Sequence, residues 1–215
     1  MEVDEVISAI EKMLKSDGKT VLRDLKERGK DPFVVLIGTI LSQRTRDERT
    51  EDAVKRLFER FKGVEDLAEA SPDEVAELIR GVGFYRSKSK SIVEVARIIR
   101  DKYKGIVPKD MEELLKLPSV GRKTANCVLV YGHGLNAIPV DTHVHRIANR
   151  IGIVSTRTPE ETEMKLREKV PERLWIILND LLVSFGRSIC KPIGPKCEVC
   201  TIKQECNYYK KVREK

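Results

Sequence analysis

The sequence predicts an all-α fold. Apolar residues recur three and four positions apart through most of the chain, which is the spacing of one buried helix face. Residues that cap helices precede several of these stretches, and no alternating pattern typical of paired strands interrupts them. The periodic stretches are Val3–Leu14, Phe33–Leu41, Ala53–Phe61, Val75–Ile79 and Ile92–Ile99.

Composition narrows the function classes. The chain has 215 residues, enough for one domain or two small ones, and its formal net charge of +7 favours a polyanionic partner. No run of about 20 apolar residues is present, so no membrane span is expected. The first nineteen residues form a charged amphipathic pattern rather than a signal peptide, and we expect a cytoplasmic, nucleoid-associated protein.

Four helix starts carry a capping oxygen. They are Asp31, Ser71, Asp110 and Thr158. In the last three, a glutamate follows three residues later, which is the capping-box arrangement. The pattern breaks at residues 131–134, where two glycines fall close together, so a seam is expected near residue 135.

A helical hairpin is predicted around residue 119. The short helix Asp110–Lys116 leads into a tight turn, and a second helix begins near Arg122. A helix N-terminus directs backbone N–H groups and the positive end of its dipole at an anion, while Gly121 allows close approach. The pattern Val120-Gly121-Arg122-Lys123 thus favours a helix-hairpin-helix that grips nucleic-acid backbone. An ordinary corner of a helical bundle is the alternative.

The C-terminal cysteines predict a metal centre. They are spaced Cys190-x6-Cys197-x2-Cys200-x5-Cys206, and thiolate sulfur selects iron–sulfur clusters or zinc. Disulfides are disfavoured, because the preceding 189 residues hold only Cys127. Zinc sites made of four cysteines usually contain two Cys-x2-Cys pairs, and here there is one. The spacing favours iron–sulfur and leaves zinc open.

Taken together, these motifs resemble the endonuclease III family of DNA glycosylases, within the helix-hairpin-helix superfamily. The hairpin 117–125, the segment 140–146 and the cysteine tail occur in the family's order, and 40–47 and 83–88 match its DNA-facing loops. The resemblance implies two helical domains with a DNA-binding groove between them. It places a six-helix domain at 25–135 and a discontinuous cluster domain at 1–24 and 136–215. It also implies that the four cysteines hold a 4Fe-4S cluster.

The same resemblance implies the chemistry. It aligns Lys123 with the family's nucleophile and Asp141 with its carboxylate. A lysine amine can attack C1′ of the sugar and form a Schiff base, after which β-elimination nicks the strand. A carboxylate stabilises positive charge that develops on the sugar. Each residue has a plainer alternative: Lys123 as a phosphate contact, and Asp141 as the N-cap of a helix beginning at Thr142.

Further residues are expected to contact DNA. Phe84 resembles a wedge that fills the hole left by a flipped base, with a core aromatic as its alternative. Gln43 and Arg44, where the resemblance implies a contact with the opposite strand, depart from the family's pattern by a shift of one position. Lys191 and Lys196 lie between the first two cluster cysteines and are suited to phosphate contacts.

Three further expectations concern local structure. Ser119 replaces a common glycine, and would cost about 1 kcal/mol if the backbone φ there were positive. His143 is expected to make a structural hydrogen bond near Asp141. Cys127 is expected to be a small buried residue.

The resulting prediction is a bifunctional enzyme. Lysine at position 123 favours a glycosylase with abasic-site lyase activity, acting as a monomer on oxidised or ring-saturated pyrimidines flipped out of duplex DNA. A monofunctional adenine or thymine mismatch glycosylase on the same scaffold is one alternative. A non-catalytic DNA-binding module that senses redox state through its cluster is another.

Overall fold

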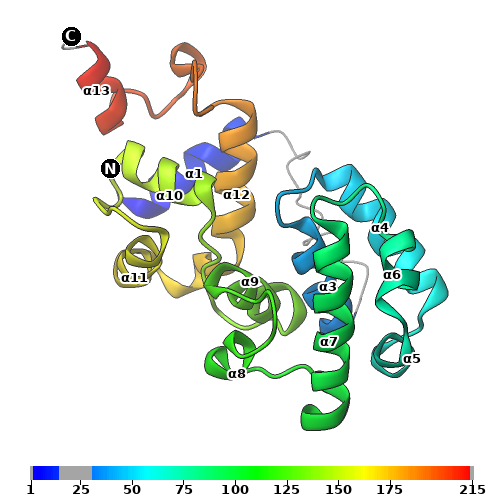
Figure 1. Cartoon of the computed structure of the whole chain (residues 1–215). Coiled ribbons are helices and arrows are strands. Elements are labelled where there is room, and N and C mark those ends of the chain that lie inside the picture. Colours follow the sequence, from blue (N-terminus) through cyan, green and yellow to red (C-terminus); the bar gives the residue numbers. More distant parts are fainter. Residues whose placement is uncertain (1, 15–30, 214–215) are drawn as a thin grey trace. The chain divides into compact units, whose positions relative to one another are not determined.

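The computed structural model describes residues 2–14 and 31–213, and the regular structure in these ranges is helical (Figure 1). The predicted all-α fold is confirmed. The extended pairing seen among these residues is one isolated bridge between Arg80 and Val82. None of the helices in the described part of the chain is both long and apolar enough to cross a membrane.

The chain divides into two compact units. One comprises Val21–Leu135, and the other comprises Met1–Thr20 together with Asn136–Lys215. The predicted domain boundary between residues 24 and 25 lies outside the described residues.

The first unit contains the hairpin. Its described elements are α3 (Pro32–Ser42), α4 (Asp47–Arg60), α5 (Val64–Glu69), α6 (Pro72–Leu78), α7 (Tyr85–Tyr103), α8 (Met111–Leu115), α9 (Arg122–Cys127) and the π-helical turn η1 (Val128–Gly132).

Helix α3 is the centre of this unit. It is apolar on all faces, and its residues from Val35 to Leu41 are buried. A helix of this composition must be enclosed by others, and α4, α7, α9 and η1 pack against it (Figure 1). Its start follows the predicted signal, because Asp31 Oδ1 accepts a hydrogen bond from the N–H of Phe33 at 2.8 Å.

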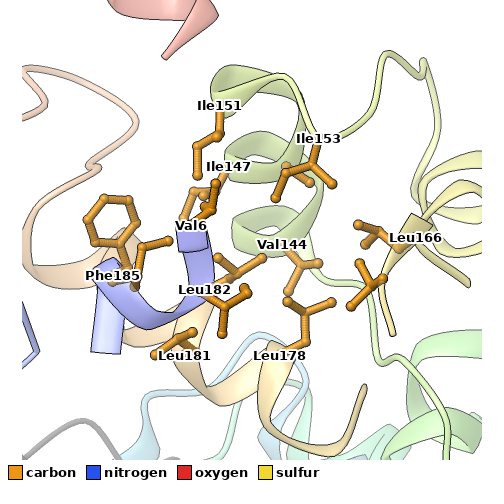
Figure 2. Close-up of a cluster of buried hydrophobic side chains, with 14 of the residues drawn as sticks. Val6, Val144, Ile147, Ile151, Ile153, Leu166, Leu178, Leu181, Leu182 and Phe185 are labelled. Atoms are coloured by element: carbon orange, nitrogen blue, oxygen red, sulfur yellow. The ribbon is translucent and has the colours of Figure 1, made fainter. Parts of the chain in front are cut away.

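The second unit joins the N-terminal helix to the C-terminal third of the chain. Its described elements are α1 (Val3–Met13), α10 (Thr142–Ile151), α11 (Pro159–Lys169), η2 (Glu172–Leu174), α12 (Trp175–Ser188), η3 (Cys197–Val199) and α13 (Asn207–Arg213). Figure 2 shows its core, in which Val6 of α1 meets side chains of α10, α11 and α12, including Ile147, Leu166 and Phe185.

All four predicted N-caps are formed. In the three predicted capping boxes, the glutamate does not accept a hydrogen bond from the N–H of the N-cap residue, because each glutamate has another partner. Glu161, for example, accepts from the N–H of Arg157 at 2.8 Å instead of from its cap residue. Glu113 pairs with Lys102 at 2.8 Å, and this ammonium, together with Lys116 and Tyr103, lowers the pKa of Glu113 to about 2.

Two helices extend beyond their apolar stretches on the N-terminal side. Helix α4 starts at Asp47, before the stretch that begins at Ala53, and α7 starts at Tyr85, before the stretch that begins at Ile92. In α7 the inward positions of the first turns are occupied by Lys88 and Ser89, which are only 6% and 2% exposed. An apolar pattern does not count such residues, so the start of this helix was not visible in the sequence.

Candidate functional site

The predicted hairpin is present. Helix α8 ends at Leu115, the turn buries Leu117 and Val120, and α9 begins at Arg122. Gly121 is the N-cap of α9 and offers no side-chain cap, and a Cβ built on it would meet nothing within 4 Å. The hairpin therefore presents open backbone at the start of α9. The Val120 side chain is 6% exposed, so any contact it makes with DNA would come from its backbone.

The backbone of Ser119 has the positive φ at which serine in place of glycine is expected to be strained. Its φ is 62°, in the left-handed region, which is strained for a residue with a Cβ. Its hydroxyl lies 2.9 Å from the hydroxyl of Ser91 in α7. This hydrogen bond at an exposed site offsets only part of the strain.

Replacing Ser119 by glycine is expected to stabilise the protein. Glycine adopts a positive φ at no steric cost, so the free energy of unfolding should rise by up to about 1 kcal/mol, or about 2–4 °C in melting temperature. Calorimetry measures the change. Ser119→Ala is the matched control, because it removes the bond to Ser91 but keeps the strain, and it should melt below the wild type. A glycine variant no more stable than the alanine variant would contradict this account.

Gln43 connects helix α3 to the hairpin. It is the C-cap residue of α3, and its Nε2 donates to the Ser119 carbonyl at 2.9 Å and to Thr124 Oγ1 at 3.2 Å. The side chain is thereby held against the hairpin turn and the first turn of α9. Of these two neighbouring residues, Gln43 supports the hairpin, whereas the side chain of Arg44 lies near Phe84.

Arg44 and Phe84 form an exposed pair. Both have left-handed backbone, with φ of 51° and 58°, and the Arg44 guanidinium carbon lies 5.7 Å from the centroid of the Phe84 ring. Phe84 is the N-cap residue of α7 and is 65% exposed. This exposure excludes the alternative of a core aromatic and leaves the ring available as a wedge.

The two candidate catalytic residues lie at helix starts in different units. Lys123 is half-buried in the first turn of α9. Asp141 is the N-cap of α10, as its plainer alternative predicted, and accepts hydrogen bonds from the N–H groups of His143 at 2.9 Å and Val144 at 2.8 Å. Both bonds end on Oδ1. Within the described chain, Oδ2 takes no part in capping, so the cap and a second role are compatible.

His143 makes the structural hydrogen bond expected of it. Its Nδ1 accepts from Arg146 Nη2 at 3.2 Å, and the same nitrogen of Arg146 donates to the Cys190 carbonyl at 3.0 Å. Burial lowers the pKa of His143, which favours the neutral ring that this bond requires. Gly186 makes room for the contact, since a Cβ there would lie 2.5 Å from His143 Nδ1.

The four C-terminal cysteines line one pocket. Cys190 follows α12, Cys197 begins η3, and Cys200 and Cys206 follow in the C-terminal loop, around side chains that include Phe185. No disulfide joins cysteines in the described ranges, and no three metal-binding side chains there stand close enough for one ion. Burial and the neighbouring cysteines raise the pKa of the Cys197 and Cys200 thiols. The four cysteines thus do not form a site for a single ion, but soft donors that line one apolar pocket are the residue type that holds a multi-iron cluster.

Arg150 orders the loop between the first two cysteines. Its Nη1 donates to the Lys191 carbonyl at 2.7 Å, and its Nη2 donates to the Pro192 carbonyl at 2.9 Å. The guanidinium also stacks on Tyr208, 4.3 Å from the ring centroid. Lys191 and Lys196 are both exposed on this loop, where they can reach phosphates. Cys127, expected to be buried, is 0% exposed.

Sequence reasoning missed three positively charged residues that hold these segments: Lys88, Arg146 and Arg150. Their spacing on helices is that of ordinary surface residues. Their acceptors are mostly backbone carbonyls far along the chain, which have no signature in side-chain pattern.

Comparisons with known proteins identify the family. A family model, the HhH-GPD superfamily base excision DNA repair protein, matches residues 37–172. Endonuclease III of Thermotoga maritima is 53% identical over 202 residues, covering 94% of each protein. A solved non-covalent endonuclease III–DNA complex matches 99% of this chain and 97% of that one, with a TM-score of 0.88 and 34% identity.

A trapped endonuclease III–DNA covalent intermediate, an estranged-adenine complex, covers 86% of this chain and 87% of that one, with a TM-score of 0.80 and 37% identity. The fold that carries the hairpin, Asp141 and the cysteine pocket in this chain is shared with these solved structures. The chain belongs to the endonuclease III family, within the HhH-GPD superfamily of base excision DNA repair proteins.

Proposed function

We propose that this protein removes oxidised or ring-saturated pyrimidines from duplex DNA and then nicks the strand through a Schiff base on Lys123. Its family membership makes it a DNA glycosylase with associated abasic-site lyase activity. The observation that carries the assignment of residues is a lysine in the first turn of the hairpin's second helix, behind an uncapped glycine start. Lysine there can serve as nucleophile, which a mismatch glycosylase that stops at base release does not need.

Base release requires a nucleophile and charge stabilisation. The neutral Lys123 amine attacks C1′, the bond from C1′ to the base nitrogen breaks, and the base leaves with its electron pair and takes up a proton. The Asp141 carboxylate stabilises the positive charge that the sugar develops, and it accepts a proton from the attacking amine. Its Oδ2 is the oxygen suited to this role, because Oδ1 is committed to the N–H groups of α10.

Strand nicking follows from the imine. Opening of the sugar gives a protonated imine between Lys123 and C1′, which acidifies the protons on C2′. Loss of one of them moves an electron pair into a C2′–C3′ double bond, and the 3′ phosphate leaves with the electrons of the C3′–O bond. Water then hydrolyses the imine, which releases an unsaturated aldehyde and regenerates the lysine.

DNA binding uses several of the described surfaces. The backbone at Gly121 and the loop lysines Lys191 and Lys196 supply contacts to phosphates, which position the duplex without reading its sequence. Arg44 and Phe84 fill the space left by the extruded nucleotide. One chain supplies all these groups, so a monomer acting on chromosomal DNA in the cytoplasm suffices.

The cysteine pocket is proposed to hold a 4Fe-4S cluster. Its four thiolates come from Cys190, Cys197, Cys200 and Cys206. Arg150 fixes the loop beside it by donating to two of the loop's carbonyls. When bound, the cluster supplies a rigid cross-link between the loop and the end of α12, and no redox step is required of it. The structural role fits the chain's own contacts, since Arg146 joins the same loop to His143.

Borohydride trapping tests the proposed function. The protein is incubated with a duplex that carries one thymine glycol, borohydride is added, and the adduct is digested and located by mass spectrometry. An adduct on Lys123, together with strand cleavage, is the expected result. Alkali-labile strands without an adduct would establish monofunctional base release instead. Binding without base loss would leave a DNA-binding module and refute the enzyme assignment for this lesion class.

Loss of the cluster is expected to weaken DNA binding. Cys200→Ser should lower iron content and release the loop that carries Lys191 and Lys196, so that affinity for a duplex falls about tenfold at moderate salt. Iron analysis and fluorescence anisotropy measure the two effects. Cys127→Ala is the matched control, because this cysteine does not line the pocket and its loss should leave iron content unchanged. Full iron content in Cys200→Ser would contradict the ligand assignment.

A further inference from the structure

Lys88 is a buried cation whose side-chain hydrogen bonds all go to the C-terminal end of α3 and the loop that follows it. Its side chain lies in the second turn of α7 and is 6% exposed. The ammonium donates to the carbonyls of Leu41 at 2.8 Å and Gln43 at 2.5 Å, and to Thr45 Oγ1 at 3.2 Å. Three acceptors use the full donor capacity of a lysine. Two of them are carbonyls at the C-terminal end of α3, where the helix dipole favours a positive charge.

The same loop is fastened to the turn that carries Phe84. Thr45 Oγ1 accepts a hydrogen bond from the N–H of Gly83 at 3.1 Å. The two backbones lie so close that a Cβ on Gly83 would meet the Arg44 carbonyl oxygen at 2.6 Å. The N–H of Lys88 in turn donates to the Phe84 carbonyl at 3.0 Å. Lys88 therefore bonds to both segments that meet here. Its side chain bonds to the α3–α4 loop, and its backbone N–H bonds to Phe84.

From this geometry we infer that Lys88 is a positioning residue for base extrusion, which locks Arg44 and Phe84 together as one preformed wedge. The inference rests on the proposed function, because Arg44 and Phe84 can act as a wedge only in a protein that flips a nucleotide out of a duplex. Both wedge residues hold left-handed backbone, with φ of 51° and 58°, which for side-chain-bearing residues persists only where surrounding contacts enforce it. The Lys88 bonds to Gln43 and Thr45, on either side of Arg44, are such contacts.

The chemistry of Lys88 sets it apart from a residue kept for stability alone. Burial lowers its pKa to about 8, so the ammonium is held in an environment that disfavours its charge. No carboxylate bonds to it among the contacts of the described residues. An apolar side chain of similar length would fill the same space without that desolvation cost. An apolar residue cannot bond to the end of α3 and to two residues of the α3–α4 loop at once.

The test compares two substrates that differ in the need for extrusion. One is a duplex with a single thymine glycol, and the other is a single-stranded oligonucleotide with an abasic site, from which no base has to be flipped. Lys88→Met is expected to slow single-turnover cleavage of the duplex about 10- to 100-fold, as for a misplaced positioning group. Borohydride trapping on the single strand should stay within about twofold of the wild type. Lys90→Met is the matched control, an exposed lysine on the same helix, and both of its activities should match the wild type.

Two further variants keep the test decisive if Lys88→Met folds poorly. Thr45→Val removes the hydroxyl shared by Lys88 and Gly83, and Gly83→Ala forces the two turns apart, while both retain the lysine. Both should lose duplex cleavage and keep trapping on the single strand. Duplex cleavage at the wild-type rate in these variants, or a parallel loss on both substrates, would overturn the inference. A wild-type protein that forms an adduct on neither substrate would refute the proposed function itself.

Discussion

Replacement of Lys123 by alanine is expected to abolish strand nicking and covalent trapping while duplex binding persists. The amine is the only group in the proposed mechanism that forms a bond to the sugar, so its loss should reduce the single-turnover rate of nicking by at least about 10³-fold. Binding should change little, because one phosphate contact among many is worth a modest part of the affinity. Gel analysis of borohydride-treated and untreated duplex, with anisotropy on the same samples, measures both quantities.

Lys123→Arg separates the nucleophile from the plainer alternative of a phosphate contact. Arginine keeps the positive charge and binds phosphate well, but its guanidinium does not form a Schiff base under these conditions. If Lys123 acts as nucleophile, the arginine variant should fail in trapping as completely as the alanine variant. Nicking by Lys123→Arg at near wild-type rate would show that the residue only contacts DNA, and the lyase chemistry would then need another amine.

The helix starts around the candidate site could be predicted because they are local. A cap acts through hydrogen bonds that span two or three residues, so Asp110 and Asp141 reveal the starts of α8 and α10 from a short window of sequence. Gly121 before two basic residues marks the start of α9 in the same way. The sequence could predict that Ser119 would be strained if its φ were positive. It could not predict the φ of 62° itself, which depends on the geometry of the whole turn.

The packing that supports the wedge could not be predicted, because it is non-local. Lys88 finds its acceptors in Leu41, Gln43 and Thr45, between 43 and 47 positions earlier in the chain. Nothing within its own helix distinguishes it from exposed Lys90, and both fall in a stretch without apolar periodicity. The first turns of α7 lack apolar periodicity for the same reason: their inward positions are Lys88 and Ser89, and Lys88 finds its side-chain acceptors in another segment.

The cysteine tail lies between these cases. Its spacing within seventeen residues predicts a shared site from local sequence, and the four residues do line one pocket. The groups that order the loop come from elsewhere, since Arg146 and Arg150 belong to α10, about 40 positions upstream of the cysteines. Pattern could therefore predict the donors, while the contacts that hold the loop in place required the fold.

Asp141→Asn should lower base excision by about 10²–10³-fold without unfolding the protein. The cap and the charge are separable at this residue, because asparagine caps a helix about as well as aspartate but carries no negative charge to stabilise the sugar cation. The bonds from the N–H groups of His143 and Val144 to Oδ1 should be retained by the asparagine carbonyl oxygen. Single-turnover release of thymine glycol measures the rate, and calorimetry should find only a small loss from the interaction of the charge with the helix dipole.

Asp141→Ala completes the comparison, since it removes the charge and the cap together. It should lose excision to the same extent as the asparagine variant, and in addition about 1 kcal/mol of stability, or about 2–4 °C in melting temperature. The two variants thus differ in stability and agree in rate if the carboxylate is catalytic. If Asp141 served only as an N-cap, asparagine would restore excision as well as stability, and the two variants would part in both measurements. Excision lowered equally in both variants, with a loss of stability only in the alanine variant, would show that Asp141 serves both the helix and the reaction, with Oδ1 already committed to the helix.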